Sequence, residues 1–541
     1  MTHSTEAGAR LPRDTLLMSE VGKPSRFRRL ILTLKSMGGP LLAGAAAAFT
    51  FPPLHLLPIL PFAFLVLMRG IDRAQTMRQA AWAGFAFGFG LHAVGLYWLI
   101  NAILIRASEF WWFVPFPSMG CALILAPFAA VPAALCRVVP AGWRRGVLFA
   151  ALWTLCDMGR LFLFSGFTWN PLGSDWAFHG LAGDVMIQPV AWIGVDGLTL
   201  LTVILAVTMP LERRAMVGGG IVLVVWASLG AARFYGLQAQ ESVASGNATS
   251  PTVVLVQGNV PEQEKISRAD MQAVFERYLR LTRQGVVQAV EETGRAQGPA
   301  HPVVYVWPET AFPGVLEEDA FARSMIARTA SGATAGVIGT LRIGSDQHWR
   351  NSVVALDEDG KVEGVYDKAT LVPFGEYQPR FLPLQVVPGG GMTPGPGPLS
   401  WHLSGLSAVG PLVCYEVIFS GHVVDRHDRP DWLVNVTNDA WYGNSAGPRQ
   451  HLAAVRLRAV EEGLPIARAA NTGVSIVYDA RGHDLGRLEW GVTGVLIRAL
   501  PAPLPPTPFA RFGQAIPVGL CLFAALVTFP WRPRKSYGRG S

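Results

Sequence analysis

The sequence predicts a two-part protein, in which a polytopic α-helical membrane domain of about eight helices carries a layered α/β domain. The chain of 541 residues is too long for one compact core. Hydrophobic residues make up 50% of it and charged residues only 15%, whereas ordinary soluble domains carry roughly 25% charged residues. Long apolar runs flank a polar region, residues 237–512, in which strand-like and helix-like patterns alternate.

The apolar runs predict where the chain crosses a membrane. About 20 apolar residues span a bilayer. By this measure, crossings lie near residues 38–51, 54–68, 80–104, 113–136, 146–164, 186–207, 216–236 and 513–530. The first two are short and are separated by Pro52 and Pro53, so they could form a tight helical hairpin. We therefore expect a basic tail over residues 1–37, a seven-helix membrane domain over 38–236, an α/β domain over 237–512, a last helix over 513–530 and a second basic tail over 531–541.

Short clusters of basic residues between the apolar runs predict the orientation of the chain. The net charge is +7, but the basic residues form no single patch or stripe, so nucleic acid is not an expected partner. Both tails and the loops that carry Arg73, Arg144 and Arg213 are basic, whereas the alternate short loops are poor in Lys and Arg. The positive-inside rule therefore predicts that both tails and these basic loops lie in the cytoplasm. Residues 237–512 then lie in the periplasm of a bacterium with two membranes.

The polar region is predicted to be an α/β domain. Helical patterns cover residues 267–293 and 448–470, and Ser267 is a suitable N-cap for the first. Short strand-like runs cover residues 252–260, 302–309, 335–343, 352–360, 410–417, 432–439 and 474–482. Strands that alternate with helices are typical of a layered α/β domain.

Three motifs with reactive side chains follow strand-like runs in this domain. Glu309 lies in "VYVWPETAFP", and Cys414 lies in "VCYEVIF". Lys368 lies in "YDKATLVPFGEY", with Glu376 eight residues further on. A thiolate is a strong nucleophile, a carboxylate can take its proton, and an ammonium can stabilise a developing oxyanion. This combination suits covalent acyl transfer.

Cys414 is the only cysteine of the α/β domain, because the others lie in or beside apolar segments: Cys121, Cys136, Cys156 and Cys521. The domain therefore cannot form an internal disulfide, and Cys414 is expected to be a free thiol. A lone cysteine in an apolar strand is usually a packing residue. The presence of the other two motifs favours catalysis here.

The motifs "WPET", "DKATLVPFGEY" and "CYEVIF" resemble the Glu–Lys–Cys motifs of the nitrilase/carbon–nitrogen hydrolase superfamily. The membrane-spanning flanks narrow the resemblance to the apolipoprotein N-acyltransferases, which "VQGNVPEQEK", "TNDAWYG" and "WNPLGSDW" also resemble. This resemblance implies an α-β-β-α sandwich, with Cys414 as nucleophile, Glu309 as general base and Lys368 as the lysine that stabilises the intermediate. One departure is Ile266, where the family often shows a tryptophan.

The resemblance also implies roles for residues around the triad. Glu376 corresponds to a second glutamate near the triad, and Tyr415 and Glu416 match residues that line the site. Trp441 and Tyr442 are either core residues or part of a lipid site. Asp157 and Arg160, at i and i+3 in the fifth crossing, either neutralise one another or mark a functional site.

The activity implied by the resemblance is transfer of an acyl chain from a phospholipid to the N-terminal amine of a diacylglyceryl-cysteine in an apolipoprotein. The expected partners are this donor, this acceptor and the lipid bilayer, at the bacterial inner membrane. The sequence shows no metal cluster, GxGxxG fingerprint or P-loop, so we expect no metal and no cofactor. A membrane-tethered amidase that uses water as acceptor, and a transporter with a large periplasmic receptor domain, are the alternatives.

Overall fold

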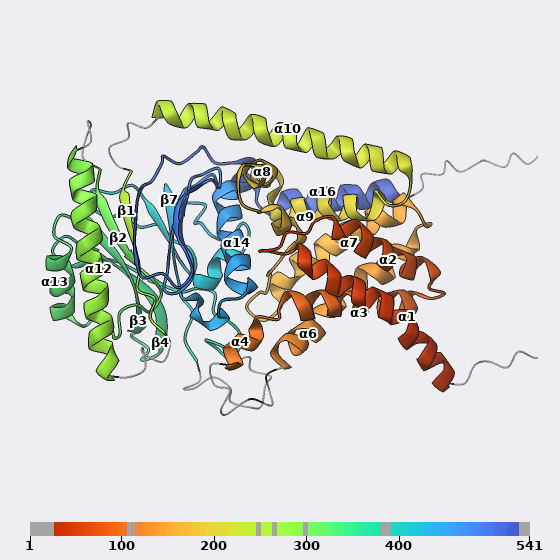
Figure 1. Cartoon of the computed structure of the whole chain (residues 1–541), viewed down its shortest axis with the longest axis horizontal. Helices are drawn as coiled ribbons and strands as arrows, with labels where there is room; N and C mark the ends of the chain where they lie inside the picture. The colour runs from red at the N-terminus through yellow and green to blue at the C-terminus, as the bar shows by residue number, and fades with distance from the viewer. Residues whose placement is uncertain are drawn as a thin grey trace, which may run out of the picture.

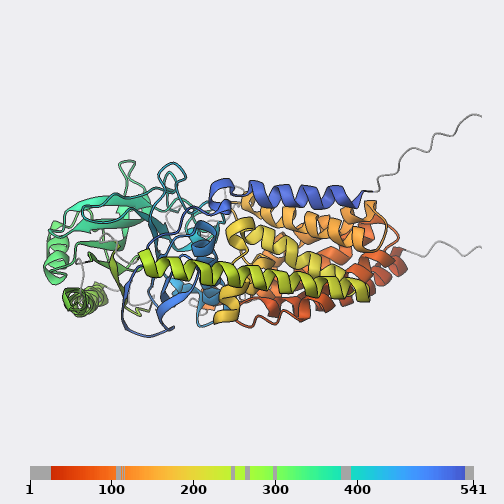
Figure 2. The same cartoon turned by 90° about the horizontal axis from the view of Figure 1, so that it is seen from above.

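The protein folds as a bundle of helices and an α/β domain that lie end to end (Figure 1, Figure 2). The computed structural model describes residues 26–104, 111, 114, 116–244, 250–261, 268–295, 301–378 and 391–529. The bundle comprises the N-terminal helices together with the C-terminal helix α16 (Ala515–Thr528), which packs against α7 and α9. Chain segments from both ends of the sequence therefore build one bundle.

A helix lies in each apolar stretch that the sequence singles out. The helices of the bundle are α1 (Arg26–Ala47), α2 (Ile59–Arg73), α3 (Met77–Gly95), α4 (Leu99–Leu104), α6 (Phe116–Leu135), α7 (Trp143–Gly159), α8 (Leu181–Met186), α9 (Val190–Thr208) and α10 (Arg213–Ala244), with α16. Three apolar helical stretches among the described residues are long enough to cross a membrane: Phe116–Val138, Val190–Thr208 and Arg213–Leu237. Shorter apolar helices cover Met37–Thr50 and Ala515–Thr528.

Several helix ends differ from the predicted ones. Helix α1 begins at Arg26, inside the stretch predicted to be a tail. The stretch predicted as one helix over 80–104 is divided into α3 and α4, because the chain leaves helical geometry at Leu96. Helix α10 continues past Gly236 to Ala244 and runs alongside both parts of the molecule (Figure 1). Hydropathy fixes the apolar centre of a helix, whereas polar turns that extend it carry no such signal.

Glycines let α3 pack closely between α1 and α6. A Cβ at Gly84 would lie 2.4 Å from the Ala129 carbonyl oxygen of α6, and a Cβ at Gly90 would lie 2.2 Å from the Leu41 carbonyl oxygen of α1. Small residues at helix crossings permit this approach in membrane bundles, where van der Waals packing drives association. The sequence "AGFAFGFG" thus places α3 at the centre of its neighbours.

The α/β domain contains two β-sheets. The larger has the order β11-β1-β2-β3-β4-β5 and the smaller has the order β10-β9-β8-β7-β6. The strands are β1 (Thr252–Gln257), β2 (Val303–Trp307), β3 (Ala335–Ile343), β4 (Trp349–Asp357), β5 (Val362–Asp367), β6 (Val409–Val413), β7 (Trp432–Thr437), β8 (Ile466–Ala470), β9 (Ser475–Tyr478), β10 (Asp484–Leu488) and β11 (Gly494–Ala499). β1, β2 and β3 are parallel, as are β6, β7 and β8.

The two sheets and the helices form four layers. Apolar side chains from both sheets, such as Val304 and Val434, share one buried core between the sheets. Helices α12 (Arg268–Arg295) and α13 (Ala320–Thr329) pack on the outer face of the larger sheet through a second core. Helix α14 (Ala446–Glu462) covers the smaller sheet and lies between it and the helix bundle (Figure 1). This arrangement confirms the expected α-β-β-α sandwich.

The helix predicted over residues 448–470 is wrong in its second half. Helix α14 ends at Glu462, followed by Gly463 in the left-handed conformation with φ of 68°. Residues Ile466–Ala470 form strand β8, which pairs with β7 and β9. Gly463 is a favourable helix stop and Pro465 cannot continue a helix, so the apolar run after them joins the sheet. Strands β5, β10 and β11 also lie outside the predicted runs, because each is partly exposed and lacks a long apolar sequence.

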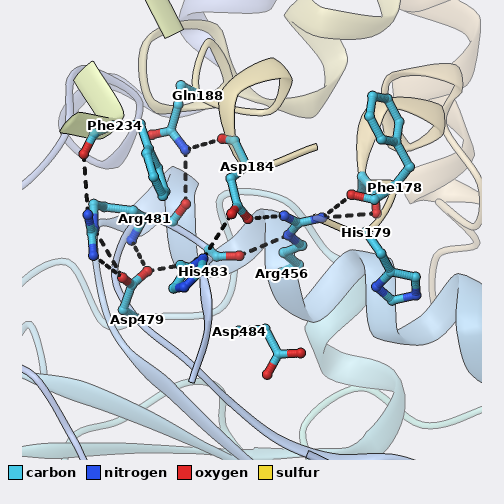
Figure 3. A network of polar contacts seen from close by, with 12 residues as sticks. Phe178, His179, Asp184, Gln188, Phe234, Arg456, Asp479, Arg481, His483 and Asp484 are labelled. Carbon is cyan, nitrogen blue, oxygen red and sulfur yellow. Dashed lines mark hydrogen bonds and ion pairs between the residues drawn. The ribbon is translucent and has the colours of Figure 1, made fainter. Parts of the chain in front are cut away.

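A network of polar side chains joins the bundle to the α/β domain (Figure 3). Buried Asp184 of α8 forms an ion pair with Arg456 of α14, and its Oδ2 lies 2.8 Å from Nδ1 of His483. Arg456 also donates a hydrogen bond to the carbonyl oxygen of Phe178 at 2.6 Å. Gln188 donates to the carbonyl oxygen of Arg481 at 2.9 Å. Asp184, Gln188 and Arg456 are buried and their contacts are directional, so they fix the angle between the two parts.

Candidate active site

The three reactive side chains singled out in the sequence meet between the two sheets. Glu309 follows β2, Lys368 follows β5 and Cys414 follows β6. The Lys368 Nζ lies 3.5 Å from Oε1 of Glu309. Cys414, Lys368 and Glu309 expose only 5%, 1% and 7% of their surfaces. The fold therefore brings one thiol, one ammonium and one carboxylate into an enclosed site.

Cys414 sits at a sharp turn between strand β6 and the short 3-10 helix Cys414–Ile418. Its φ of 49° lies in the left-handed region, which a residue with a Cβ rarely adopts. Such a conformation costs about 1–3 kcal/mol and needs support from its surroundings. Glu416 accepts a hydrogen bond from the Val413 N–H at 2.7 Å, and Nε2 of His451 lies 3.0 Å from the Cys414 carbonyl oxygen. These contacts hold the turn that presents the thiol.

Glu309 is held by partners on both of its oxygens. Oε1 accepts a hydrogen bond from Nδ2 of Asn351 at 2.7 Å, and Oε2 accepts one from the Asn438 N–H at 2.8 Å. Together with Lys368, these donors fix the position and direction of the Glu309 side chain. A carboxylate held in this way can accept a proton at a defined position.

Lys368 is buried between two carboxylates. Its Nζ donates a hydrogen bond to Oε1 of Glu376 at 2.8 Å and lies 3.5 Å from Oε1 of Glu309. Burial by itself lowers the pKa of Lys368, but the charges of Glu376 and Glu309 outweigh it and raise the pKa above its ordinary value. The ammonium therefore keeps its charge over the whole physiological pH range.

The thiol of Cys414 is expected to be protonated at neutral pH. Burial and the nearby charge of Glu309 raise its pKa above the ordinary value, and Lys368 opposes them without reversing the shift. A thiol in this state needs a base at the moment of attack. Glu309 is the carboxylate whose charge acts most strongly on it.

The two glutamates expected around the triad, Glu376 and Glu416, have different contacts. Glu376 contacts Lys368 directly and also accepts a hydrogen bond from Asn351 at 2.8 Å. Glu416 instead accepts hydrogen bonds from Tyr366 and from the Ala369 N–H, both at 2.7 Å, so it ties the loop of Lys368 to the turn of Cys414. Its carboxylate supports the backbone of the site.

The aromatic residues of the site face the helix bundle. Tyr415 donates a hydrogen bond to the Gly166 carbonyl oxygen at 2.7 Å, and its ring stacks on Trp169 with centroids 6.4 Å apart. Tyr442 packs edge-on against Trp98 with centroids 4.8 Å apart. Trp441 leaves 47% of its surface exposed. Tyr415 and Tyr442 thus form a wall between the site and the bundle, while Trp441 lies at the surface.

Asp157 and Arg160 form an ion pair of 3.2 Å at the end of α7. Arg160 also donates a hydrogen bond to the Trp169 carbonyl oxygen at 3.1 Å. The pair therefore anchors the segment "WNPLGSDW" against the bundle. Ser267 and Ile266 lie outside the described residues.

Several polar residues at the site were not predicted from the sequence. Asn351 of β4 bridges Glu309 and Glu376. Asp439 lies 3.1 Å from Nδ1 of His451, and Arg468 donates to Asp439 at 2.6 Å. These last three side chains are fully buried. A polar residue inside an apolar strand, as in "WRNSVV", is the signal that could have identified Asn351. Among the described residues, no group of three potential metal ligands is present.

Comparisons with known proteins find a matching family model for each part of the chain. Residues 43–208 match the family model described as the apolipoprotein N-acyltransferase N-terminal domain, and residues 253–504 match carbon-nitrogen hydrolase. A solved structure of an amidase of the nitrilase superfamily from Nesterenkonia matches 50% of this chain and 96% of its own, with a TM-score of 0.35 and 20% identity.

Relatives of similar length match nearly the whole chain. The apolipoprotein N-acyltransferase of Rhodopseudomonas palustris is 34% identical over 524 residues, which cover 90% of this chain and 94% of that protein. The one of Bradyrhizobium diazoefficiens is 33% identical over 92% of this chain and 95% of that protein. Identity at this level across both parts means that the chain belongs to the apolipoprotein N-acyltransferase family.

Proposed function

We propose that the chain transfers an acyl chain from a phospholipid to the N-terminal amine of diacylglyceryl-cysteine in apolipoproteins. Membership of the apolipoprotein N-acyltransferase family supports this activity. The single observation in the structure that carries it is the buried ion pair of Lys368 with Glu309, whose charges both act on the buried thiol of Cys414. The completed product is a mature lipoprotein, so the reaction is a step of lipoprotein biosynthesis.

In the first half-reaction, the Cys414 sulfur attacks the ester carbonyl carbon of the phospholipid. Glu309 takes the thiol proton, because the raised pKa of Cys414 leaves that proton in place until attack. The carbonyl oxygen of the ester becomes an oxyanion, whose charge Lys368 stabilises. The carbon–oxygen bond then breaks, Glu309 returns the proton to the leaving oxygen, and a lysophospholipid departs from a thioester on Cys414.

In the second half-reaction, the acceptor amine attacks the thioester carbonyl carbon. Glu309 removes a proton from the attacking nitrogen, and Lys368 again faces the oxyanion. The carbon–sulfur bond breaks, the sulfur regains its proton, and an amide remains on the lipoprotein. This ping-pong order lets one enclosed site serve two lipid substrates in turn.

The location of the site supports a reaction at a membrane surface. Helix α14 and the wall of Tyr415 and Tyr442 lie between the triad and the apolar bundle. Both substrates are lipids in the bilayer, so the reactive groups must be reached from the membrane side. We propose that the chain is a multi-pass protein with eight crossings in the bacterial inner membrane, and that residues 237–512 form a periplasmic catalytic domain.

The proposed thioester is tested by mass spectrometry. Incubation of the purified protein with a phospholipid of defined chains, in the absence of acceptor, should add one acyl mass to the peptide that contains Cys414. Cys414→Ala is the control, since it removes only the sulfur atom. An acyl adduct of equal abundance on Cys414→Ala, or free fatty acid as the main product when acceptor is present, would contradict the proposed route.

A further inference from the structure

A pocket of about 430 Å³ lies where the turn between α1 and α2 meets the start of α14. We call it the boundary pocket. Its membrane-side wall includes Phe49, Leu54 and Val94, and its opposite wall includes Asn444, Ser445 and Arg449 of the α/β domain. One wall is therefore apolar and the other polar, as at the headgroup level of a bilayer.

The apolar wall remains open in the structure. Phe49 exposes 44% of its surface and Leu54 exposes 53%. Both lie in the α1–α2 turn, which has its hydrophobic side chains beside the polar start of α14. Exposed apolar groups next to a polar wall suit a ligand that has acyl chains at one end and a polar group at the other.

Arg449 gives the polar wall a positive charge. Its guanidinium donates a hydrogen bond to the Ser445 carbonyl oxygen at 2.8 Å and lies 5.6 Å from the ring centroid of Trp490. No carboxylate of the described residues forms an ion pair with it. The first turn of α14, which Ser445 caps, adds the partial positive charge of a helix N-terminus on the same side. A half-buried, unneutralised arginine beside an apolar wall favours an anion, and its planar fork fits phosphate.

The boundary pocket is connected to the turn of Cys414 through helix α14. Gln450 lines the pocket, and its Oε1 accepts hydrogen bonds from Trp98 and Trp169, both at 2.9 Å. The next residue of α14, His451, contacts the carbonyl oxygen of Cys414. A ligand in this pocket therefore lies against Gln450, and the neighbouring residue of Gln450 in α14, His451, holds the carbonyl oxygen of Cys414.

We propose that the boundary pocket binds the phosphate-bearing headgroup of the phospholipid donor, with Arg449 at the phosphate and the apolar wall along the acyl chains. This inference rests on the proposed function and names the part of the donor that is recognised. A diacylglyceryl-cysteine carries no phosphate on its glycerol. The positive charge of Arg449 thus selects the donor over the acceptor before Cys414 is acylated.

The test is equilibrium binding by the full-length protein in detergent, in a Cys414→Ala background that prevents turnover. The probes are a phospholipid, a diacylglycerol with the same chains, and inorganic phosphate. We expect Arg449→Gln to weaken phospholipid binding about tenfold or more, since a charge-assisted contact is lost, and to leave diacylglycerol binding unchanged. Arg449→Lys should retain part of the phospholipid affinity.

Arg511→Gln is the matched control, because Arg511 is an exposed arginine of α15 (Pro508–Phe512) outside the pocket. Equal phospholipid affinity with and without Arg449, or an equal loss for diacylglycerol, would overturn the proposal. Inorganic phosphate that binds as tightly as the phospholipid would also overturn it, in favour of a free-anion site. Binding is measured without acyl transfer, so failure here is distinguishable from failure of the thioester to form.

Discussion

At the scale of single residues, Cys414 depends on its neighbours for both its conformation and its reactivity. Its left-handed backbone is supported by Glu416 and His451, which contact the turn from opposite ends. Burial keeps the thiol protonated by raising its pKa, so the attack that we propose for Cys414 must be coupled to proton transfer, with Glu309 as the proposed acceptor. An enclosed, neutral thiol has the advantage that water and small oxidants seldom reach it.

The charge of Lys368 is expected to act on the transition state of both half-reactions. Lys368→Met keeps most of the side-chain length and removes the charge, so the protein should fold while Cys414 acylates about 100- to 1000-fold more slowly. Glu309→Gln should also block acylation, because the thiol would keep its proton. The measurement is single-turnover acylation of Cys414 in detergent.

Glu376→Gln tests whether Glu376 only holds Lys368 in place or also takes part in the chemical steps. Glu376 contacts Lys368 and Asn351, and we place it outside the steps of proton transfer. The variant should therefore show slow but measurable formation of the thioester, well above that of Lys368→Met. Wild-type acylation rates in well-folded Lys368→Met or Glu309→Gln would contradict the proposed triad, whatever the behaviour of Glu376→Gln.

At the scale of elements, helix α14 connects the α/β domain to the bundle. It is buried on nearly all sides, so its polar residues must find partners on both parts. Gln450 contacts tryptophans of the bundle, Arg456 pairs with Asp184, and Glu461 accepts a hydrogen bond from the Val195 N–H of α9 at 2.7 Å. One helix therefore sets the position of the site relative to the bundle.

The contact between His483 and Asp184 should make this junction more stable at lower pH. The hydrogen bond with Asp184 raises the pKa of His483; burial and Arg481 oppose this, while Asp479 adds to it. A group with a raised folded-state pKa contributes stability that is complete below its unfolded pKa of about 6.5 and is lost as pH rises through the folded value.

We therefore expect His483→Asn to lower the unfolding temperature more at pH 6 than at pH 9, measured by thermal unfolding in detergent. His427→Asn is the control, because His427 is an exposed histidine of the same domain. An equal effect of His483→Asn at both pH values would mean that the imidazole contributes by packing alone.

At the scale of the whole molecule, the positions of the basic loops predict which side of the membrane carries the α/β domain. A reporter that is active only in the periplasm should give a signal when fused after Gly236 and no signal when fused after Arg144. The physical reason is that loops rich in Lys and Arg are retained in the cytoplasm. The opposite pattern would overturn the predicted orientation and the number of crossings before residue 237.

The sequence by itself determined the two-part architecture, the apolar centres of the helices and the residues with reactive side chains. Hydrophobic content and alternation are local properties, so "VVYVW" and "GPLVC" could be recognised as strands without knowledge of their neighbours. The same holds for Glu309, Lys368 and Cys414, whose motifs are short and contiguous. The structure places Glu309 and Cys414 after the apolar strands β2 and β6, and Lys368 after β5, which was not predicted.

Only the tertiary structure decided how these residues are supported. Asp439, His451 and Arg468 come from different elements, and no local pattern marks them as neighbours of Cys414. Strand β8 differs, because Gly463 and Pro465 are local signals that end the helix before it, whereas its place between β7 and β9 comes from long-range pairing. Buried polar groups and edge strands are stabilised by partners that only folding brings together, so their roles depend on long-range contacts.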